Sequence, residues 1–454
     1  MNAPAQSGIK DPPASFWGIL RSIGPGLILT ANIVGTGELI VTTRLGAQVG
    51  FLLLWFILFS CCIKVFVQVE LGRFAIVEGV GSLVALDRLP GPRARISWAV
   101  WLWIIMYLGT ICQMAGMVGG IAEIFVQKSQ SYTGHLLWAA ATAGVCALLL
   151  AVGRYGIVES LSTVMVALFT ISNLVAVALL QTTEWRMTGA DVAEGFRFAV
   201  PKDLVTAFAA FGITGVGAAE LVFYPLWCLE KGYARAVGPR DDSPQWEGRA
   251  SGWMRVMRTD AWLSMVVYTV ATVSFYILGA AMLHRQGKTV EDATAIATLA
   301  DMYVKTFGSW GLWIFNVGAF MVLFSTFFVS TASNSRLFAD VSSMLGVFSF
   351  RTPEDRMRVV RWGLILIPVA TLFFYLASKG IVTLILIGAT GQALMLPILG
   401  FAAIYFHRKR IPPALRARSA WTALLFLSFL AMAALGVFQA GDKTGLWRAF
   451  GWVR

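Results

Sequence analysis

Long apolar runs separated by short polar segments fill most of the chain. A helix needs about 20 mostly apolar residues to cross the hydrocarbon core of a bilayer. Eleven runs meet that requirement, near 17–47, 50–76, 97–126, 134–153, 157–181, 203–228, 260–283, 309–334, 359–378, 381–406 and 420–440. No stretch alternates with the period of two that marks a transmembrane β-strand. The pattern predicts an all-α integral membrane protein with about 11 transmembrane helices.

The first and sixth runs are interrupted near their centres. The first contains GTGE at 35–38, and the sixth contains GVGAAE at 215–220. Glycine permits backbone shapes that other residues avoid, and unwound backbone at membrane depth survives only where protein or water surrounds it. Halves of five spans, repeated in inverted orientation, place broken helices at these two positions with the substrate site between them. The sequence therefore predicts an inverted 5+5 repeat (LeuT/APC-like) with broken helices 1 and 6.

Each interruption also carries one carboxylate, Glu38 or Glu220. An ionised carboxylate inside a membrane is costly unless it is paired. We expect the two side chains to face one site, with a cation or Lys64 between them because like charges repel. The candidate substrate-binding residues are Glu38, Glu220, Thr36, Gly35, Gly217, Asn32 and Lys64. The alternatives are that the glycines only pack helices and that a carboxylate is a structural partner of Lys64.

Other polar side chains inside the runs have two interpretations each. Lys64 could neutralise a glutamate or replace a coupling cation, or it could snorkel to an interface. Glu70 lies near Arg73 and is interpreted as a structural ion pair. Gln113 and Gln392 could offer neutral oxygen ligands, although a hydrogen bond between helices is the simpler interpretation.

Composition supports the membrane interpretation. Hydrophobic residues make up 57% of the 454 residues and charged residues only 13%, about half the charged share of a soluble domain. The net charge of +12 is interpreted as basic loops on the cytoplasmic side rather than as a nucleic-acid surface. This bias predicts a multi-pass protein of the cell (inner) membrane with its N-terminus in the cytoplasm and its C-terminus outside.

One transmembrane domain is expected at 17–440, with repeats at about 17–181 and 203–406 and an extra span at 420–440. It is flanked by a cytoplasmic tail at 1–16 and a C-terminal tail at 441–454. The polar segment from Glu230 to Asp260 is interpreted as a cytoplasmic connector. The five cysteines lie in apolar stretches and the three histidines near run ends, without metal-ligand spacing. No cofactor is expected. No nucleophile–base arrangement or phosphate loop points to an enzyme.

The residues around the first interruption resemble a known family. Residues 24–55, GPGLILTANIVGTGELIVTTRLGAQVGFLLLW, resemble the start of the natural resistance-associated macrophage protein (Nramp) family of divalent-metal transporters. Gln68 and Arg73 fall where that family has Gln and Arg, and Leu396 and Pro397 also fit. The resemblance covers the first ten spans. It implies the inverted-repeat fold of the amino acid–polyamine–organocation superfamily. The two carboxylates at the interruptions, Glu38 and Glu220, are the candidate metal ligands if the substrate is a metal.

The family's metal-site motif differs in this chain. The family carries Asp-Pro-Gly-Asn in span 1, where this sequence has GTGE at 35–38, and Ala/Val-Met-Pro-His in span 6, where it has AAEL at 218–221. Ala219 therefore stands at the position of the family's methionine, and it joins the candidate site on that basis. The acidic residues of span 3 align with Thr110 and Gln113. These differences predict a divergent member of the family.

Three functions remain open. The first is transport of a divalent cation, with a hard ion such as Mg²⁺ or Mn²⁺ expected because the charged ligands are carboxylates. For Mg²⁺, the site should be roomy enough to hold a partly hydrated ion. Weak or absent proton coupling is expected because few titratable groups line the spans. The second is a carrier for an amine or amino acid on the same scaffold, and the third is a non-transporting membrane sensor. The sequence does not indicate an oligomeric state.

Overall fold

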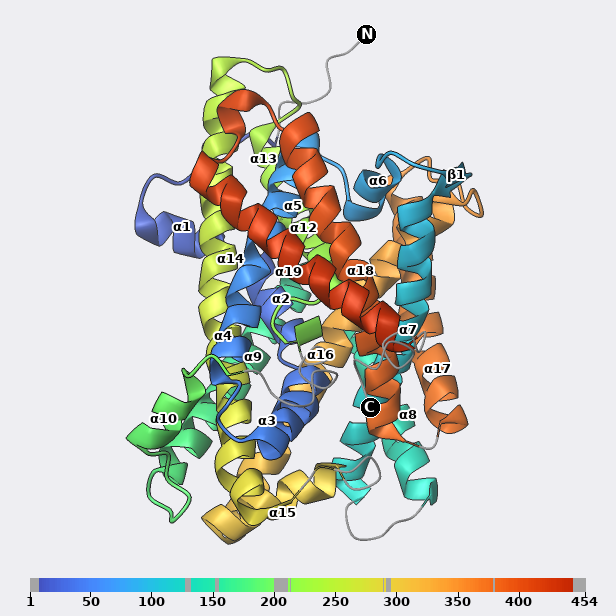
Figure 1. Cartoon of the computed structure of the whole chain (residues 1–454). Coiled ribbons are helices and arrows are strands. Elements are labelled where there is room, and N and C mark those ends of the chain that lie inside the picture. The colour runs from blue at the N-terminus through green and yellow to red at the C-terminus, as the bar shows by residue number, and fades with distance from the viewer. Residues whose placement is uncertain are drawn as a thin grey trace.

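The computed structural model describes residues 8–126, 132–151, 155–199, 211–212, 214–288, 290, 295–378 and 380–443. Within these residues the regular elements are helices, apart from a short antiparallel pair of strands, β1 (Arg93–Ala94) and β2 (Ile96–Ser97). Figure 1 shows a bundle of long helices with shorter helices gathered at its two ends.

Nine described helical stretches are long and apolar enough to cross a membrane, and ten if the bent first pair counts as one span. They comprise α4 (Leu54–Ile63) with α5 (Val65–Glu78), α7 (Trp98–Val126), α8 (Tyr132–Leu150), α9 (Tyr155–Leu180), α14 (Pro244–Leu278) with η2 (Gly279–Leu283) and η3 (His284–Gln286), α16 (Ser309–Met344), α17 (Pro353–Ala377), α18 (Ile381–Lys409) and α19 (Ser419–Lys443). The bent pair is α2 (Pro25–Ile33) with η1 (Gly37–Thr42) and α3 (Thr43–Val49). Part of the predicted sixth span, 203–210 and 213, lies outside the described residues; α12 (Ala218–Lys231) forms its second half.

Several shorter helices complete the described structure. They are α1 (Phe16–Ser22), α6 (Ser82–Asp87), α10 (Gly189–Gly195), α13 (Tyr233–Val237), α15 (Ala295–Phe307) and η5 (Pro413–Leu415). Figure 1 places α6 and α13 at one end and α10 and α15 at the other.

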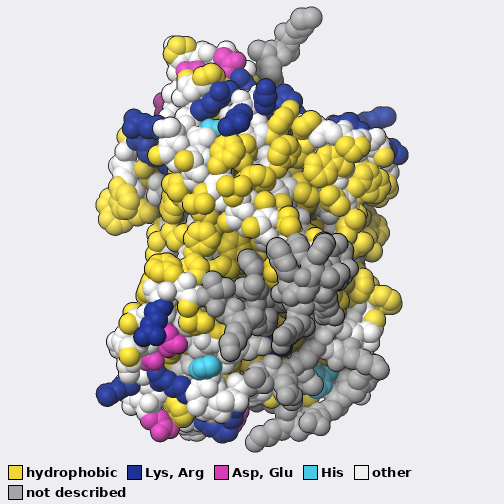
Figure 2. Space-filling model, viewed as in Figure 1, with side chains coloured by type: hydrophobic (Ala, Val, Ile, Leu, Met, Phe, Trp, Pro, Cys, Tyr) yellow, Lys and Arg dark blue, Asp and Glu magenta, His cyan; other side chains and the backbone are white. Residues whose placement is uncertain are grey.

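The outer surface has the distribution of side chains that a bilayer requires. Figure 2 shows a broad hydrophobic band around the middle, with Lys and Arg concentrated above it and charges of both signs below it. Large apolar side chains of the peripheral helices face outward within the spans, such as Leu148 of α8, Ile171 of α9 and Phe373 of α17. An apolar belt without charges fits the hydrocarbon core, where charged side chains are costly.

Helix ends follow local sequence signals. Ser243 caps α14 by accepting a hydrogen bond from the backbone N–H of Trp246, and Pro244 follows it at the first helical position. Serine caps and an initial proline are typical helix starts. Helix α14 therefore begins at Pro244, well before the apolar run near 260. The polar segment from Glu230 to Asp260 is therefore helical over its second half. Its assignment as a cytoplasmic connector stays a prediction.

The broken first span lies at the centre of the bundle. Helix α2 packs against α9, α12, α14 and α16, while α12 also packs against α5 and α18. The side chains of α2 from Ile28 to Ile33 are all buried. Protein therefore surrounds the unwound backbone. Its N–H and C=O groups lack helical partners, so they could not face lipid.

Candidate functional site

The first span breaks between Ile33 and Gly37. Helix α2 ends at Ile33, and the next helical segment restarts at Gly37 with an axis bent by 47°. The restart is a π-helix that contains Glu38. Such wide turns are rare and are frequent at functional sites. The GTGE sequence thus produces both an interruption and a carboxylate at the restart.

The sixth span breaks just before α12. Gly215 has a φ of +68°, which favours glycine because it lacks a Cβ. Gly217 is the residue that precedes the first turn of α12, and Glu220 lies in that turn. The N-terminus of a helix favours negative charge because its backbone N–H groups are unpaired.

A cavity of about 20 Å³ lies between the two breaks. It is lined by Asn32, Ile33, Gly35, Thr36, Gly37, Glu38, Thr110, Gln113, Met117, Ala219, Glu220, Thr326, Ser330 and Gln392. Glu38 and Glu220 are the charged residues in this lining, and no basic side chain is among the described residues that line it. The cavity is therefore suited to a small cation.

Glu38 connects the two breaks. Its Oε2 accepts a hydrogen bond from the Gly35 N–H at 3.3 Å, and its Oε1 accepts one from the Gly215 N–H at 3.2 Å. The carboxylate is fully buried. An ionised carboxylate offers about four lone-pair sites, so two bonds to backbone orient it and leave acceptor capacity for a ligand.

Glu220 lies in a second network that reaches α2 and α16. The Asn32 Nδ2 donates to Glu220 Oε1 at 2.5 Å, and the Ser330 hydroxyl donates to Asn32 Oδ1 at 2.7 Å. The Thr326 hydroxyl lies 3.2 Å from the carbonyl oxygens of both Ala31 and Val34, at the end of α2. These contacts fix the first break against α16.

The opposite wall is an amide pair. Gln392 Oε1 accepts from the Ala219 N–H at 3.2 Å, and Gln392 Nε2 donates to Gln113 Oε1 at 2.9 Å. Thr36 contributes a buried hydroxyl that has no hydrogen-bond partner among the described residues. A buried polar group without a partner is costly, so this oxygen is available to a substrate. The described lining is thus rich in oxygen ligands, which suit hard divalent cations.

Comparison with known proteins assigns this chain to a family. The family model described as natural resistance-associated macrophage protein-like (Nramp) matches residues 26–439 of this chain. The chain belongs to the Nramp-like family.

Individual relatives agree with that membership. The divalent metal cation transporter MntH of Xanthomonas campestris pv. campestris is 24% identical over 455 positions, covering 96% of this chain and 95% of the relative. The manganese transporter of Eremococcus coleocola, solved with an aromatic bis-isothiourea substituted compound, superposes with a TM-score of 0.73 at 15% identity, over 97% of this chain and 90% of that one. MhsT in complex with L-phenylalanine gives a TM-score of 0.59 at 12% identity, over 94% and 99%.

These comparisons confirm two predictions. The chain has the all-α transporter fold with a broken first span, shared with Nramp-like and more distant transporters. Its relatives are transporters, which confirms that it is not an enzyme. The expected loss of the family's metal-site motif stays a prediction.

The structure gathers most of the predicted site residues. Six of them line the cavity, namely Asn32, Gly35, Thr36, Glu38, Ala219 and Glu220, and Gly217 precedes the helix that carries Glu220. Their role in binding stays a prediction. Lys64 is not in the cavity lining.

Lys64 instead contacts the break in span 6. Its Nζ donates to the carbonyl oxygens of Phe211 at 2.7 Å and Thr214 at 2.5 Å, and it lies 4.8 Å from the Phe211 ring centroid. It is fully buried, so it does not snorkel to an interface. The ammonium satisfies carbonyl groups that the break exposes.

Several residues near the predicted site were not identified from the sequence. Thr326, Ser330 and Met117 line the cavity from α16 and α7, whose apolar pattern gives no sign of it. His407 was interpreted only as a residue at a span end, but its Nδ1 lies 2.9 Å from Glu70 Oε1. The Arg73 Nε also lies 3.3 Å from Glu70 Oε2, which agrees with the structural ion pair expected there.

Proposed function

We propose that the chain carries a divalent metal cation across the cell membrane through the cavity between the two broken spans. One observation carries this proposal: a carboxylate from each break lines one buried cavity, and the described lining holds no basic side chain. Relatives named as divalent metal cation transporters support it. Alternating access would reposition the halves of spans 1 and 6 around the bound ion.

Glu38 links ion binding to the shape of the breaks. Its two hydrogen bonds join Gly35 in the first span to Gly215 before the sixth. A cation on the same carboxylate would draw negative charge away from these donors and weaken both bonds. Occupancy of the site and the relative position of the two breaks are therefore coupled through one side chain.

The size of the cavity favours Mn²⁺ over Mg²⁺. Mg²⁺ sheds water reluctantly and usually keeps several waters in protein sites. A cavity of about 20 Å³ has room for about one water, which is less than the roomy site expected for a partly hydrated Mg²⁺. The same size disfavours an amino acid or amine as the substrate in this conformation.

The first expected result is metal-dependent uptake. Proteoliposomes containing the full chain should accumulate Mn²⁺ at least about 10-fold faster than Mg²⁺ at equal concentration, because Mg²⁺ gives up its bound water more reluctantly. Protein-free liposomes are the control. Uptake of an amino acid or amine without metal flux would contradict the metal proposal and favour the organic-solute carrier.

Met117 is expected to tune the site toward softer ions. Thioether sulfur binds soft metals better than hard ones, and Met117 lines the cavity, where Ala219 is predicted to stand at the position of the family's methionine. Met117→Leu should weaken Cd²⁺ binding about 10-fold and leave Mn²⁺ affinity within about threefold, measured by isothermal titration.

Met114 offers a matched control for this test. It lies on the same helix and is fully buried, but it contacts Asn334 and is not in the cavity lining. Met114→Leu should leave both affinities unchanged. Equal effects of the two substitutions on Cd²⁺ would show that Met117 contributes only packing.

Transport is proposed to have weak or no proton coupling. A proton path needs titratable groups that continue from the site through the membrane. The titratable groups found in the described cavity lining are Glu38 and Glu220. The Glu70–His407 pair lies outside that lining and is joined to Arg73. A gradient of substrate together with the membrane potential would then drive uptake.

The expected outcome is Mn²⁺ uptake without proton movement. Internal pH, followed by a trapped dye, should stay constant while Mn²⁺ enters proteoliposomes whose potential is clamped with K⁺ and valinomycin. Addition of a proton ionophore under a pH gradient confirms that the dye responds. Internal acidification that requires Mn²⁺ would show this proposal to be wrong.

The orientation is also a proposal. The basic N-terminal end of α17, the C-terminal end of α18 and the polar start of α14 carry many Lys and Arg residues, and Figure 2 shows such residues concentrated at one end. Cytoplasmic loops carry this excess. This end, and with it the N-terminus, is therefore assigned to the cytoplasm.

A further inference from the structure

A second and larger cavity lies at the basic end of the molecule, away from the transport site. Its volume is about 410 Å³, and it lies between α14, the end of α5, η5 and the start of α19. Five arginines contribute to its lining, namely Arg73, Arg255, Arg258, Arg416 and Arg418. No acidic residue is among the described residues that line it.

Three of these arginines are not neutralised within the described part of the chain. Arg73 is paired with Glu70, and Arg416 donates to the carbonyl oxygens of Ile411 and Arg408. Arg255, Arg258 and Arg418 are exposed, and none of them has an ion-pair partner among the described residues. Arg258 also lies close enough to Arg73 and Arg255 to be repelled by both.

An aromatic group forms the floor of this arginine pocket. Trp421 lines it, with ring centroids 4.8 Å from Phe66 and 6.5 Å from Trp262. The indole Nε1–H of Trp421 is buried and has no hydrogen-bond partner in the described part of the chain. Tryptophans gather at the level of lipid headgroups, so the arginines lie just above the hydrocarbon core.

Apolar surface continues from the pocket toward the middle of the membrane. Val266, two helical turns beyond Arg258 on α14, is 52% exposed, and Leu424 and Leu427 of α19 are also exposed. Positive charge above an aromatic floor and an apolar wall matches a phospholipid, whose phosphate is charged and whose chains are apolar. Arginine binds phosphate well because its planar donors form paired hydrogen bonds.

We propose that the arginine pocket binds the phosphate group of an anionic phospholipid, with the acyl chains along α14 and α19. The free donors of Arg255, Arg258 and Arg418 contact the phosphate, and the Trp421 Nε1–H donates to the headgroup. Basic pockets between spans on the cytoplasmic side are known settings for such headgroups. This proposal is independent of the transported substrate.

Lipid binding to the detergent-purified full chain, measured by native mass spectrometry, tests this proposal. Phosphatidylglycerol should bind at least about 10-fold more tightly than phosphatidylcholine with the same chains, since each arginine near the surface contributes about a factor of five for an anionic lipid. The triple variant Arg255→Gln, Arg258→Gln and Arg418→Gln should weaken phosphatidylglycerol binding about 100-fold. Equal affinities for the two lipids would overturn the proposal.

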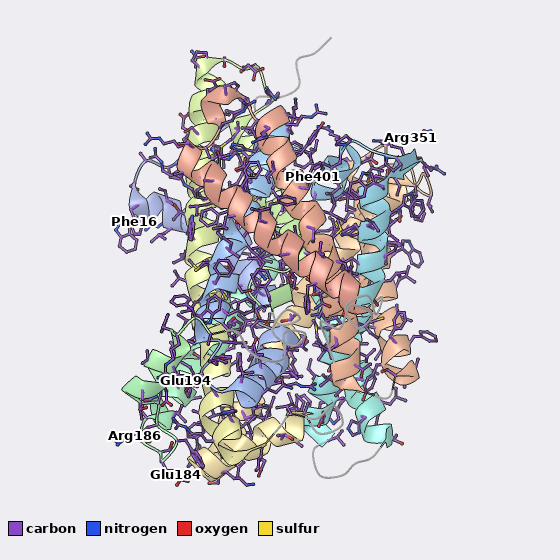
Figure 3. All side chains as sticks on the ribbon, in the orientation of Figure 1. Phe16, Glu184, Arg186, Glu194, Arg351 and Phe401 are labelled. Atoms are coloured by element: carbon purple, nitrogen blue, oxygen red, sulfur yellow. The ribbon has the colours of Figure 1, made fainter. Side chains whose placement is uncertain are left out.

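A matched triple variant separates the pocket from general surface charge. Arg351, Arg358 and Arg361 are exposed on or beside the start of α17, and Figure 3 places Arg351 on the opposite side of the same end from α14. Changing these three to Gln should leave phosphatidylglycerol affinity within about twofold, as expected for residues outside the pocket. A loss equal to that of the pocket variant would overturn the assignment.

Two further measurements, one on a Trp421 variant and one with a competing anion, identify the ligand. Trp421→Phe keeps the aromatic floor and every charge but removes the donor, and it should weaken phosphatidylglycerol about 10-fold; wild-type affinity would overturn the donor's role. Millimolar inorganic phosphate should not displace the lipid, because it lacks chains for the apolar wall. Displacement at concentrations similar to the lipid's would assign the pocket to free phosphate and overturn the lipid proposal.

Discussion

Glu38→Gln and Glu220→Gln should each weaken Mn²⁺ binding by at least about 100-fold and abolish uptake. Loss of residues that only support a metal ligand already costs roughly 10–100-fold in affinity, and these two carboxylates carry the negative charge of the described cavity lining. Binding is measured by isothermal titration and uptake in proteoliposomes. Glu184→Gln is the control, because Glu184 is exposed and Figure 3 shows it at the far end of the molecule from Arg351.

The two variants should differ in stability. The Oε1 of Glu220 accepts a hydrogen bond from the Asn32 amide, and a glutamine oxygen can accept it equally well. Glu38 accepts backbone N–H groups with both oxygens. In Glu38→Gln the side-chain NH₂ would point at one of these N–H donors, and this contact between two donors should lower the apparent Tm. Wild-type Mn²⁺ affinity in either variant would rule out the proposed site.

The sequence was sufficient to predict the cavity residues at the two breaks, but not those that α7 and α16 contribute. Glu38 and Glu220 are visible because each follows a Gly-x-Gly element inside an apolar run, a local signal. Ser330 and Met117 have no such signal, since serine and methionine are ordinary residues of membrane helices. Their role depends on how α16 and α7 pack against α2, which is set by contacts far apart in the sequence.

For Lys64, the sequence indicated the buried charge but not its partners. A lysine in the middle of an apolar run correctly indicates a buried charge that needs partners, but its spacing from Glu38 does not identify them. In the structure its Nζ contacts two backbone carbonyl oxygens at the break in span 6. Such carbonyl oxygens carry partial negative charge, which suits a cation. The pairing of Glu70 with His407 likewise depends on α18 packing against α5.

Asp260 also has a role that could not be predicted from the sequence: it binds the backbone at the start of the broken first span. Its Oδ1 accepts from the Gly24 N–H at 2.9 Å, and its Oδ2 accepts from the Gly26 N–H at 2.7 Å. These are N-terminal donors of α2 that have no partner within the helix. The Tyr224 hydroxyl lies 3.0 Å from the same carboxylate and 2.8 Å from the Met257 carbonyl oxygen. At the edge of the seventh apolar run, this aspartate gave no sign of its role.

Asp260→Ala should destabilise the protein by about 3 kcal/mol, seen as a lower apparent Tm in detergent. The substitution leaves two buried backbone donors without acceptors, and each such group costs about 1–3 kcal/mol. Asp260→Asn should fall between wild type and alanine, because its amide can accept one N–H but presents a donor to the other. Asp11→Ala removes an exposed aspartate and should change stability by less than about 0.5 kcal/mol.

Tyr224→Phe tests whether the backbone donors are the cause. Its loss should be about 1 kcal/mol, because the carboxylate keeps both backbone bonds and only the hydroxyl contact disappears. In the Asp260→Ala background the same change should cost less, since its partner is already gone, and the difference measures their coupling. If Tyr224→Phe is as destabilising as Asp260→Ala, the hydroxyl rather than the start of α2 depends on this aspartate. If Asp260→Ala leaves the apparent Tm unchanged, the first half of the broken span is held by its packing against α9 and α16 alone.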